Sequence, residues 1–408
     1  MDQKELFKKL DSHLVPDKND KFNLGAVFTP MTFVEKMLDS LPSHLWSDKN
    51  LTWLDPACGI GNFPIAIYFR LMKGLASVIP SERKRRRYIL ERMIYMSELN
   101  KSHLNKCKLL LDPHSEFKLN IYCGDSLAVK FSKFDVIVGN PPYNCGLAPL
   151  YHKFIEKFID RCKYLLFIVP SRWFSGGKGL NKFRSTMLAR NDIRFINHFD
   201  NASDIFKGVS ISGGVNYFLK DSSWNGLCNF NGSLIKLNRH DVLIDSKFYA
   251  LIDEFKNEPK LTDIYQGRCY GIETNDSRLL NHSEPGAIRC FVSQKKGFNS
   301  FIKCKADGHW KVITARATGG TKRFAHTFIG KPNEIHSGSY ISWRVDSLNE
   351  AKSLLSYLKC KLPNLLLSLR MNSHILSKDS MKWVPSPMLN KVWTDEKVYK
   401  WRAEREEC

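Results

Sequence analysis

The sequence predicts an α/β protein with a seven-stranded, mostly parallel sheet that includes an antiparallel hairpin. Two observations lead to this prediction. Up to about residue 220, short apolar runs with strand character alternate with longer segments that have the period of amphipathic helices. This alternation is typical of a parallel sheet that is covered by helices on both faces. Around residues 221–226 (DSSWNG) the pattern changes, and the rest of the chain is basic and less periodic.

The elements follow one another in a regular order. Helices are expected over FPIAIYFRLMKGLASVI (63–79), in the segment 79–92 and over LYHKFIEKFIDRC (150–162). Too few residues separate the last two strands for a crossover helix of normal length, so these strands are expected to form the antiparallel hairpin. Seven apolar runs are expected to be strands: 51–55, 93–98, 119–125, 135–140, 164–170, 193–199 and 214–219.

The length and composition bound the class of protein. The 408 residues are enough for two domains, and we expect them to be residues 1–222 and 223–408. The formal net charge of +21 indicates a polyanionic partner, for which nucleic acid is the first candidate. No stretch is apolar and long enough for a membrane span, and the charged N-terminus lacks an apolar signal core. We therefore expect a cytoplasmic protein with no membrane partner.

The cysteines do not indicate a disulfide framework or a metal site. There are 11 of them, an odd number, and none lies in a CxxC spacing. Such cysteines are expected to be thiols of a reducing compartment, and no metal is predicted.

A glycine-containing turn follows the first strand in LDPACGIGNFPIAI (54–67). Gly59 and Gly61 would let the backbone approach a ligand closely. The spacing is neither GxGxxG nor GxxxxGK[ST], so it does not favour a dinucleotide or a triphosphate. Asp55, Glu98 and Asp125 stand at the ends of three predicted strands. Because the carboxyl ends of parallel strands meet at one sheet edge, these acids are expected to surround a ligand with amino and hydroxyl groups.

The stretch NPPY (140–143) follows the fourth predicted strand. The side-chain carbonyl of Asn140 and the backbone carbonyl of Pro141 can each accept a hydrogen bond. The rings of Pro141 and Pro142 hold these carbonyls with little conformational freedom, and Tyr143 offers a ring face. Two acceptors aimed at the two N–H bonds of a planar amine would favour a tetrahedral nitrogen whose lone pair can attack.

Together, GAVFTP (25–30), DPACGIGNF (55–63), Glu98, Asp125 in CGDSL and NPPY resemble the ordered motifs of a known family. They resemble those of S-adenosylmethionine-dependent DNA methyltransferases that act on N6 of adenine. The motif order is similar to the gamma group of type II restriction–modification systems. The resemblance covers about residues 22 to 220 and implies a Rossmann-like fold with S-adenosylmethionine as cofactor. The interval from Asp55 to Glu98 is longer than in a minimal dinucleotide fold, which fits an additional helix over 79–92.

The resemblance also implies the roles of individual residues. Asp55 would lie near the methionine amine of the cofactor, Glu98 would bind both ribose hydroxyls, and Asp125 would accept from the adenine amino group. The full set implied to bind the cofactor is Thr29, Pro30, Asp55, Ala57, Gly59, Gly61, Glu98, Asp125, Ser126 and Asn140. The catalytic residues would be Asn140, Pro141, Pro142 and Tyr143.

The target base must leave the duplex before its amino group can react. Tyr143 is expected to stack on one face of this base. The segment 204–223 (DIFKGVSISGGVNYFLKDSS) resembles the region that provides the second aromatic wall. Phe218 is the first candidate there, and Phe206 is the second.

The C-terminal half is expected to be a basic target-recognition domain. From Arg289 to His326 there are nine Lys or Arg residues and one acid, Asp307. Such a stretch suits phosphate contacts together with reading of base edges. The residues expected to contact DNA are Lys295, Lys296, Lys303, Lys305, Lys311, Arg316, Lys322 and Arg323.

The resemblance leaves two other substrates open. An NPPY motif on this kind of fold also occurs in enzymes that methylate ribosomal RNA bases or a glutamine amide of a protein. The basic C-terminal half and the position of GAVFTP ahead of the glycine-containing turn favour double-stranded DNA. We expect a stand-alone, monomeric modification enzyme that acts beside a possible cognate restriction endonuclease.

Overall fold

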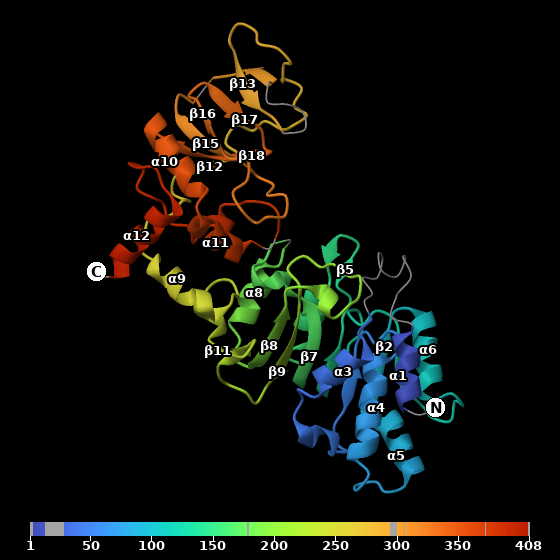
Figure 1. Cartoon of the computed structure of the whole chain (residues 1–408). Coiled ribbons are helices and arrows are strands. Elements are labelled where there is room, and N and C mark those ends of the chain that lie inside the picture. The colour runs from blue at the N-terminus through green and yellow to red at the C-terminus, as the bar shows by residue number, and fades with distance from the viewer. Residues whose placement is uncertain are drawn as a thin grey trace. The chain divides into compact units, whose positions relative to one another are not determined.

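The computed structural model describes residues 3–12, 28–177, 179–293, 300–305, 307–371 and 373–406 (Figure 1). The chain divides into two compact units, Met1–Leu243 and Ile244–Cys408. The helices of the first unit are α1 (Gln3–Asp11), α3 (Met31–Leu38), α4 (Asn62–Gly74), α5 (Glu82–Tyr88), α6 (Lys101–Leu111), α7 (Tyr151–Phe158) and α8 (Asn181–Leu188). Its short 3₁₀ or π turns are η1 (Ser43–Trp46), η2 (Ile89–Met93), η3 (Ser171–Phe174), η4 (Ala202–Asp204) and η5 (Leu237–Arg239).

The main sheet of the first unit contains all seven predicted strands. These are β1 (Trp53–Asp55), β2 (Ile94–Glu98), β3 (Asn120–Cys123), β4 (Phe134–Gly139), β7 (Cys162–Pro170), β8 (Ile193–Phe199) and β9 (Val215–Asp221). The strand order is β11-β10-β8-β9-β7-β4-β1-β2-β3. β3, β2, β1, β4 and β7 are parallel to one another, and β9 lies antiparallel between β7 and β8. The expected mixture of a parallel sheet and an antiparallel pair is therefore present.

Two further strands correct both the strand number and the domain boundary that the sequence predicted. β10 (Cys228–Phe230) pairs in parallel with β8, and β11 (Ser233–Ile235) pairs with β10. The sheet thus has nine strands rather than seven, and the first unit extends to Leu243 rather than residue 222. Asn231 and Gly232 join β10 to β11, and both have positive φ angles of 47° and 90°. Asn-Gly is favoured in two-residue hairpin turns of this kind because both residues tolerate positive φ.

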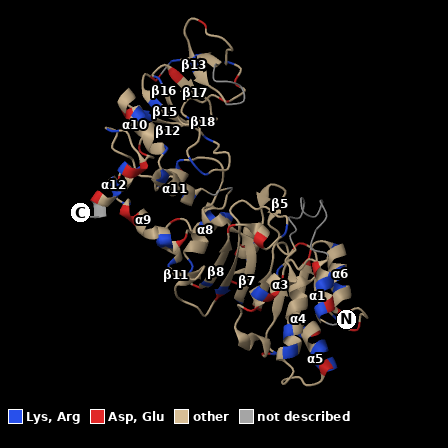
Figure 2. Ribbon diagram, in the orientation of Figure 1, with Lys and Arg blue, Asp and Glu red and all other residues tan. Residues whose placement is uncertain are grey.

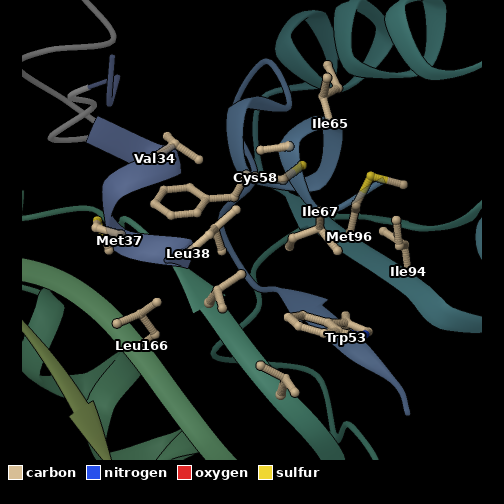
Figure 3. Close-up of a cluster of buried hydrophobic side chains, with 14 of the residues drawn as sticks. Val34, Met37, Leu38, Trp53, Cys58, Ile65, Ile67, Ile94, Met96 and Leu166 are labelled. Atoms are coloured by element: carbon tan, nitrogen blue, oxygen red, sulfur yellow. The ribbon is translucent and has the colours of Figure 1, made fainter. Parts of the chain in front are cut away.

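The central strands β4 and β7 are buried on both faces, as expected for strands flanked by helices. In β7, Tyr164, Leu166 and Ile168 belong to a core cluster on one face, and the residues between them are equally buried on the other face. Figure 3 shows part of this cluster, in which Val34 and Leu38 of α3 gather with side chains of the strands and of α4. This rigid layer supports the loops that follow the carboxyl ends of β1, β2 and β4.

The second unit contains two small sheets and several helices. One sheet has the order β12-β18-β15-β16 and the other β14-β13-β17. Its strands are β12 (Tyr265–Gly267), β13 (Ala287–Phe291), β14 (Ser300–Lys303), β15 (Trp310–Ala315), β16 (Phe328–Gly330), β17 (Glu334–His336) and β18 (Tyr340–Val345). Its helices are η6 (Ser246–Phe248), α9 (Tyr249–Glu254), α10 (Leu348–Leu358), α11 (Lys361–Arg370), η8 (Asp379–Met381) and α12 (Asp395–Glu406). Within the described ranges of both units, no helix combines the length and apolarity that crossing a membrane requires.

Candidate active site

Acidic side chains at three neighbouring strand ends meet in one cavity of the first unit. Asp55 ends β1, Glu98 ends β2, and Asp125 lies two residues beyond β3. All three line a cavity of about 280 Å³, together with Asn140, which directly follows β4. The order of strands reverses between β1 and β4, where open α/β sheets bind their ligands. These four residues therefore lie together at the carboxyl edge of the sheet, as their positions at the strand ends predicted.

Asp55 is the most deeply buried of the three acids. One of its carboxylate oxygens accepts a hydrogen bond from the Ala57 N–H at 3.0 Å. Burial, with a smaller contribution from the negative charge of Glu98, raises the pKa of Asp55 to about 8. Its carboxylate is therefore costly to ionise, and a bound cation would favour the ionised form.

Glu98 holds the glycine-containing turn against the end of β2. Its two carboxylate oxygens accept hydrogen bonds from the Gly59 N–H at 2.8 Å and the Asn100 N–H at 2.7 Å. Each oxygen can accept a second bond because a carboxylate offers about four lone-pair sites. Glu98 can therefore bind a hydroxyl group while it keeps the turn in place.

The two glycines that the sequence singled out have different surroundings. Gly59 has a φ of 54° and lines the cavity. Gly61 has a φ of 103° and lies outside the lining, where a Cβ would come within 2.7 Å of Cys107 Sγ on α6. Gly61 thus allows α4 and α6 to pack closely. Pro30 also lies outside the lining and precedes the first turn of α3.

A third glycine was missed by the sequence interpretation. Gly139, at the end of β4, has a φ of 154°, and a Cβ there would lie 2.7 Å from Asp55 Oδ1. A side chain at this position would push the carboxylate of Asp55 out of its place. The sequence signal was available, because this glycine directly precedes Asn140 in GNPPY.

Thr29 connects the start of the described core to the NPPY loop. Asn140 Nδ2 donates to Thr29 Oγ1 at 3.1 Å, and Asn62 Nδ2 donates to the backbone carbonyl of Thr29 at 2.8 Å. The first bond holds the amide nitrogen of Asn140 toward Thr29. The amide oxygen, Oδ1, therefore points away from Thr29. Asn62 was not predicted and lines the cavity at the first position of α4. Residues 25–27 of the expected GAVFTP motif lie outside the described residues.

The loop after β3 is fastened from two sides. Ser126 is buried and its hydroxyl donates to the Pro56 carbonyl at 2.6 Å. Lys157 of α7 donates to the carbonyls of Ser126, Leu127 and Val129 at 2.6, 2.8 and 2.5 Å. Burial lowers the pKa of Lys157. Both Ala57 and Ser126 line the cavity, together with Asp125.

The NPPY loop separates this cavity from a second one of about 240 Å³. Asn140 and Pro142 line the first cavity, whereas Tyr143 lines the second, and Pro141 is buried. Arg172 in η3, beyond the carboxyl end of β7, also lines the second cavity, as do Ser210 and Ser212. One short loop thus contributes to both spaces.

The first candidate for a second aromatic wall is corrected by the structure. Phe218 lies in the middle of β9 with a fully buried side chain. Its neighbours Tyr217 and Leu219 belong to the core cluster that contains Tyr143, so strand alternation turns Phe218 to the opposite face of the sheet. Phe206, the second candidate, lies edge-on to Tyr143 with ring centroids 6.4 Å apart.

The cations predicted to contact DNA differ in their exposure. Lys295 and Lys296 lie outside the described residues. Lys305 and Arg323 are exposed, Arg316 and Lys322 are half-buried, and Lys303 is exposed and paired with Glu284 at 2.8 Å. Figure 2 shows Lys and Arg spread over both units with acidic residues among them.

Lys311 is a correction to that prediction. Its side chain is fully buried and donates to the carbonyls of His309, Lys331 and Glu334 at 2.8 to 3.0 Å. It also pairs with Asp307 at 3.0 Å. An ammonium group with all its donors engaged inside the fold cannot reach a phosphate.

Comparisons with known proteins agree with the motifs. Residues 66–206 match the family of Eco57I restriction-modification methylases. An uncharacterised adenine-specific methylase of Mycoplasma pneumoniae is 25% identical, with 60% of this chain and 80% of the relative covered. The modification methylase CviBIII of Paramecium bursaria Chlorella virus NC1A is 28% identical over 38% of this chain and 40% of its own length. The chain thus spans less than half of that relative, and most of the first.

A solved structure is similar over the whole chain. The DrdV–DNA complex has a TM-score of 0.60 at 12% identity, covering 100% of this chain and 60% of that one. At this identity the likeness shows the fold alone. The predicted resemblance to adenine-specific methylases of restriction–modification systems is confirmed by the family match and the two relatives.

Proposed function

We propose that this chain is a DNA adenine-N6 methyltransferase of a restriction–modification system that uses S-adenosylmethionine. The family match and the adenine-specific relatives support the reaction class. The observation that carries the proposal is the position of Asn140, beside three strand-end acids and bonded to Thr29. Methylation of an RNA base or of a glutamine amide would use the same amide and acids, and it is the adenine-specific relatives that favour DNA adenine as the substrate.

The residues of the first cavity fit the proposed cofactor. S-adenosylmethionine supplies an electrophilic methyl group when it is bound. Asp55 pairs with the amino group at the methionine end, and because its pKa is raised, a cation beside it favours its ionisation. Glu98 accepts from the ribose hydroxyls, and Asp125 accepts from the exocyclic amine of the cofactor's adenine. The lack of a Cβ at Gly59 and Gly139 leaves room beside Asp55 and Phe28.

Asn140 and Pro141 act on the amino group of the target adenine. An aromatic amine is a weak nucleophile because its lone pair is delocalised into the ring. Asn140 Oδ1 and the Pro141 carbonyl accept hydrogen bonds from the two N–H groups of the target amine. These bonds favour a tetrahedral nitrogen with its lone pair turned toward the methyl group. No base is needed before transfer, because the methylated nitrogen loses its proton to water afterwards.

Tyr143 holds the target base, and Phe206 supports Tyr143. Tyr143 lines the second cavity, where its ring would stack on the base, and Phe206 contacts the Tyr143 ring edge-on from the core. Phe218 is removed from the second aromatic position, since it lies on the other face of the sheet, and Phe206 is given the role of supporting the Tyr143 ring. The target adenine must be extruded from the duplex to reach this position.

The second unit serves as the target-recognition domain. Lys303, Lys305, Arg316, Lys322 and Arg323 remain candidates for phosphate or base contacts, and Lys311 is removed from that set. Lys322 lies in the turn after β15 with a φ of 52°, beside two glycines that also have positive φ. We further infer that the protein acts as a cytoplasmic monomer on double-stranded DNA, beside a restriction endonuclease for the same site.

The experiment that tests the catalytic assignment compares Asn140→Ala with the unchanged protein. Removing one preorganised acceptor is expected to reduce methyl transfer to duplex DNA by roughly 10²- to 10³-fold. Binding of S-adenosylhomocysteine, measured by calorimetry, should change only a few-fold because the three acids remain. Asn191→Ala, an exposed position after α8, is the matched control. Near-normal turnover in Asn140→Ala would show that the amide does not act on the amine.

A further inference from the structure

A short hairpin directly follows the NPPY loop. It consists of β5 (Asn144–Cys145) and β6 (Ala148–Pro149), joined by a two-residue turn of Gly146 and Leu147. Gly146 has a φ of 57°, as tight turns of this length require. At its base the Leu150 N–H donates to the Tyr143 carbonyl at 2.9 Å. The hairpin is therefore tied to the residue that is proposed to stack on the target base.

Leu147 at the tip of this hairpin is 85% exposed, more than any other large hydrophobic side chain in the described part of the chain. A single exposed leucine is ordinary on a protein surface. The position of this one is not ordinary, because it lines the second cavity together with Tyr143 and Arg172. Cys145, in the same hairpin, lines the first cavity. The hairpin thus reaches from the cofactor cavity to the mouth of the base cavity.

We propose that Leu147 inserts into the base stack of the substrate duplex and occupies the space that the extruded adenine leaves. This inference rests on the proposed function. Unstacking a base costs free energy, and apolar side chains that wedge between bases offset this cost in other DNA-bending proteins. Insertion also removes the leucine from water, which favours the inserted state. A hairpin with a fixed turn loses little conformational freedom when its tip becomes ordered.

The substrate duplex is the occupant that the surroundings favour. The tip lies four residues from Tyr143, so anything that covers it must also lie over the entrance to the base cavity. Arg172 in the lining supplies a positive charge suited to the phosphate next to an extruded nucleotide. A protein partner at this place would block the substrate from the site.

The test uses 2-aminopurine in place of the target adenine, in a duplex whose recognition sequence is first read from methylated DNA. Binding of the unchanged protein should raise the 2-aminopurine fluorescence, because the base leaves the stack. Leu147→Ala should give a smaller rise and lower the methylation rate of a normal duplex by about tenfold or more. Leu147→Met should retain most of both. Leu234→Ala, on the exposed face of β11, is the matched control, because Leu234 is 67% exposed in the same unit.

A second duplex distinguishes the loss of an inserting side chain at residue 147 from a general disturbance of the site by the substitution. Opposite an abasic site the target adenine is unpaired and easy to extrude, so Leu147→Ala should methylate that duplex nearly as fast as the unchanged protein does. If Leu147→Ala lowered the methylation rate equally on both duplexes, or on neither, the proposed insertion of Leu147 would be overturned. Failure of the unchanged protein to methylate any DNA would instead overturn the proposed function.

Discussion

Asp55 illustrates how a single residue can couple ligand binding to proton release. Its pKa is raised to about 8, first by burial and then by the neighbouring charge of Glu98. In the unfolded chain the group returns to its ordinary pKa near 3.8. Protonation is therefore favoured by the fold, and the contribution of Asp55 to stability is fully present below about pH 3.8, falls as the pH rises, and is lost by about pH 8.

This raised pKa leads to a prediction about cofactor binding. At pH 7, a group with a pKa of about 8 is about 0.9 protonated, so pairing with the cofactor's ammonium should release close to one proton. Calorimetry with S-adenosylhomocysteine in buffers of different ionisation enthalpy measures this number. Asp55→Asn should abolish the release. Absence of proton release from the unchanged protein at pH 7 would mean that Asp55 is already ionised or does not face the amine.

At the residue scale, the strand-end acids and Asn140 were predictable because their place depends only on local sequence and on the direction of the strands. The face of the sheet on which an aromatic side chain lies was not predictable in the same way. Phe218 lies in β9, where strand alternation turns it away from the Tyr143 cluster, whereas Phe206 lies in the loop ahead of β9 and belongs to that cluster. The prediction that Lys311 contacts DNA was wrong because its side chain lies on the inward face of β15. Two of its three carbonyl partners, Lys331 and Glu334, are distant in the sequence, so the local pattern did not reveal them.

At the element scale, α7 does more than cover the sheet. Its Lys157 directs one ammonium group at three consecutive or nearly consecutive carbonyls of the loop that begins at Asp125. Within that loop, Asp125 itself accepts from the Leu127 N–H at 2.8 Å. The loop that holds Asp125, the acid proposed to bind the adenine of the cofactor, is thus held by a residue outside the cavity lining.

Lys157→Met should therefore weaken cofactor binding more than it slows transfer. The methionine keeps the packing of the side chain but leaves three carbonyls without their donor, so the KM for S-adenosylmethionine should rise by about tenfold. kcat at saturating cofactor should change little. Lys157→Arg should not rescue, because a planar guanidinium cannot meet three converging carbonyls as an ammonium does. Lys153→Met, at an exposed position of the same helix, is the control.

A lower kcat with an unchanged KM would contradict this positioning role. Such a result would place the effect of Lys157 on the chemical step rather than on the loop that holds the cofactor.

The regular elements of the first unit were predictable from apolar runs and helical periodicity, and all seven expected strands form. The added strands β10 and β11 were missed although Asn231-Gly232 is a strong hairpin signal, because each strand has only three residues. The β5–β6 hairpin was missed for the same reason, since two-residue strands have no measurable period. Short elements depend on pairing partners that the local sequence does not reveal.

At the scale of the whole molecule, the two units divide the proposed work. The first supplies the cofactor cavity, the NPPY loop and the hairpin with Leu147, and the second supplies exposed cations on its loops. The net charge of +21 favours a polyanion as partner. The charge is the same for DNA and RNA, and the feature that favours DNA is the position of GAVFTP ahead of the glycine-containing turn.

The measurement that tests the central claim most directly offers the protein three substrates in parallel. The protein is incubated with methyl-labelled S-adenosylmethionine and either duplex DNA, ribosomal RNA or a peptide release factor. The predicted result is label on N6-methyladenine of duplex DNA. Label on RNA or protein, with none on N6-methyladenine in DNA, would contradict the account.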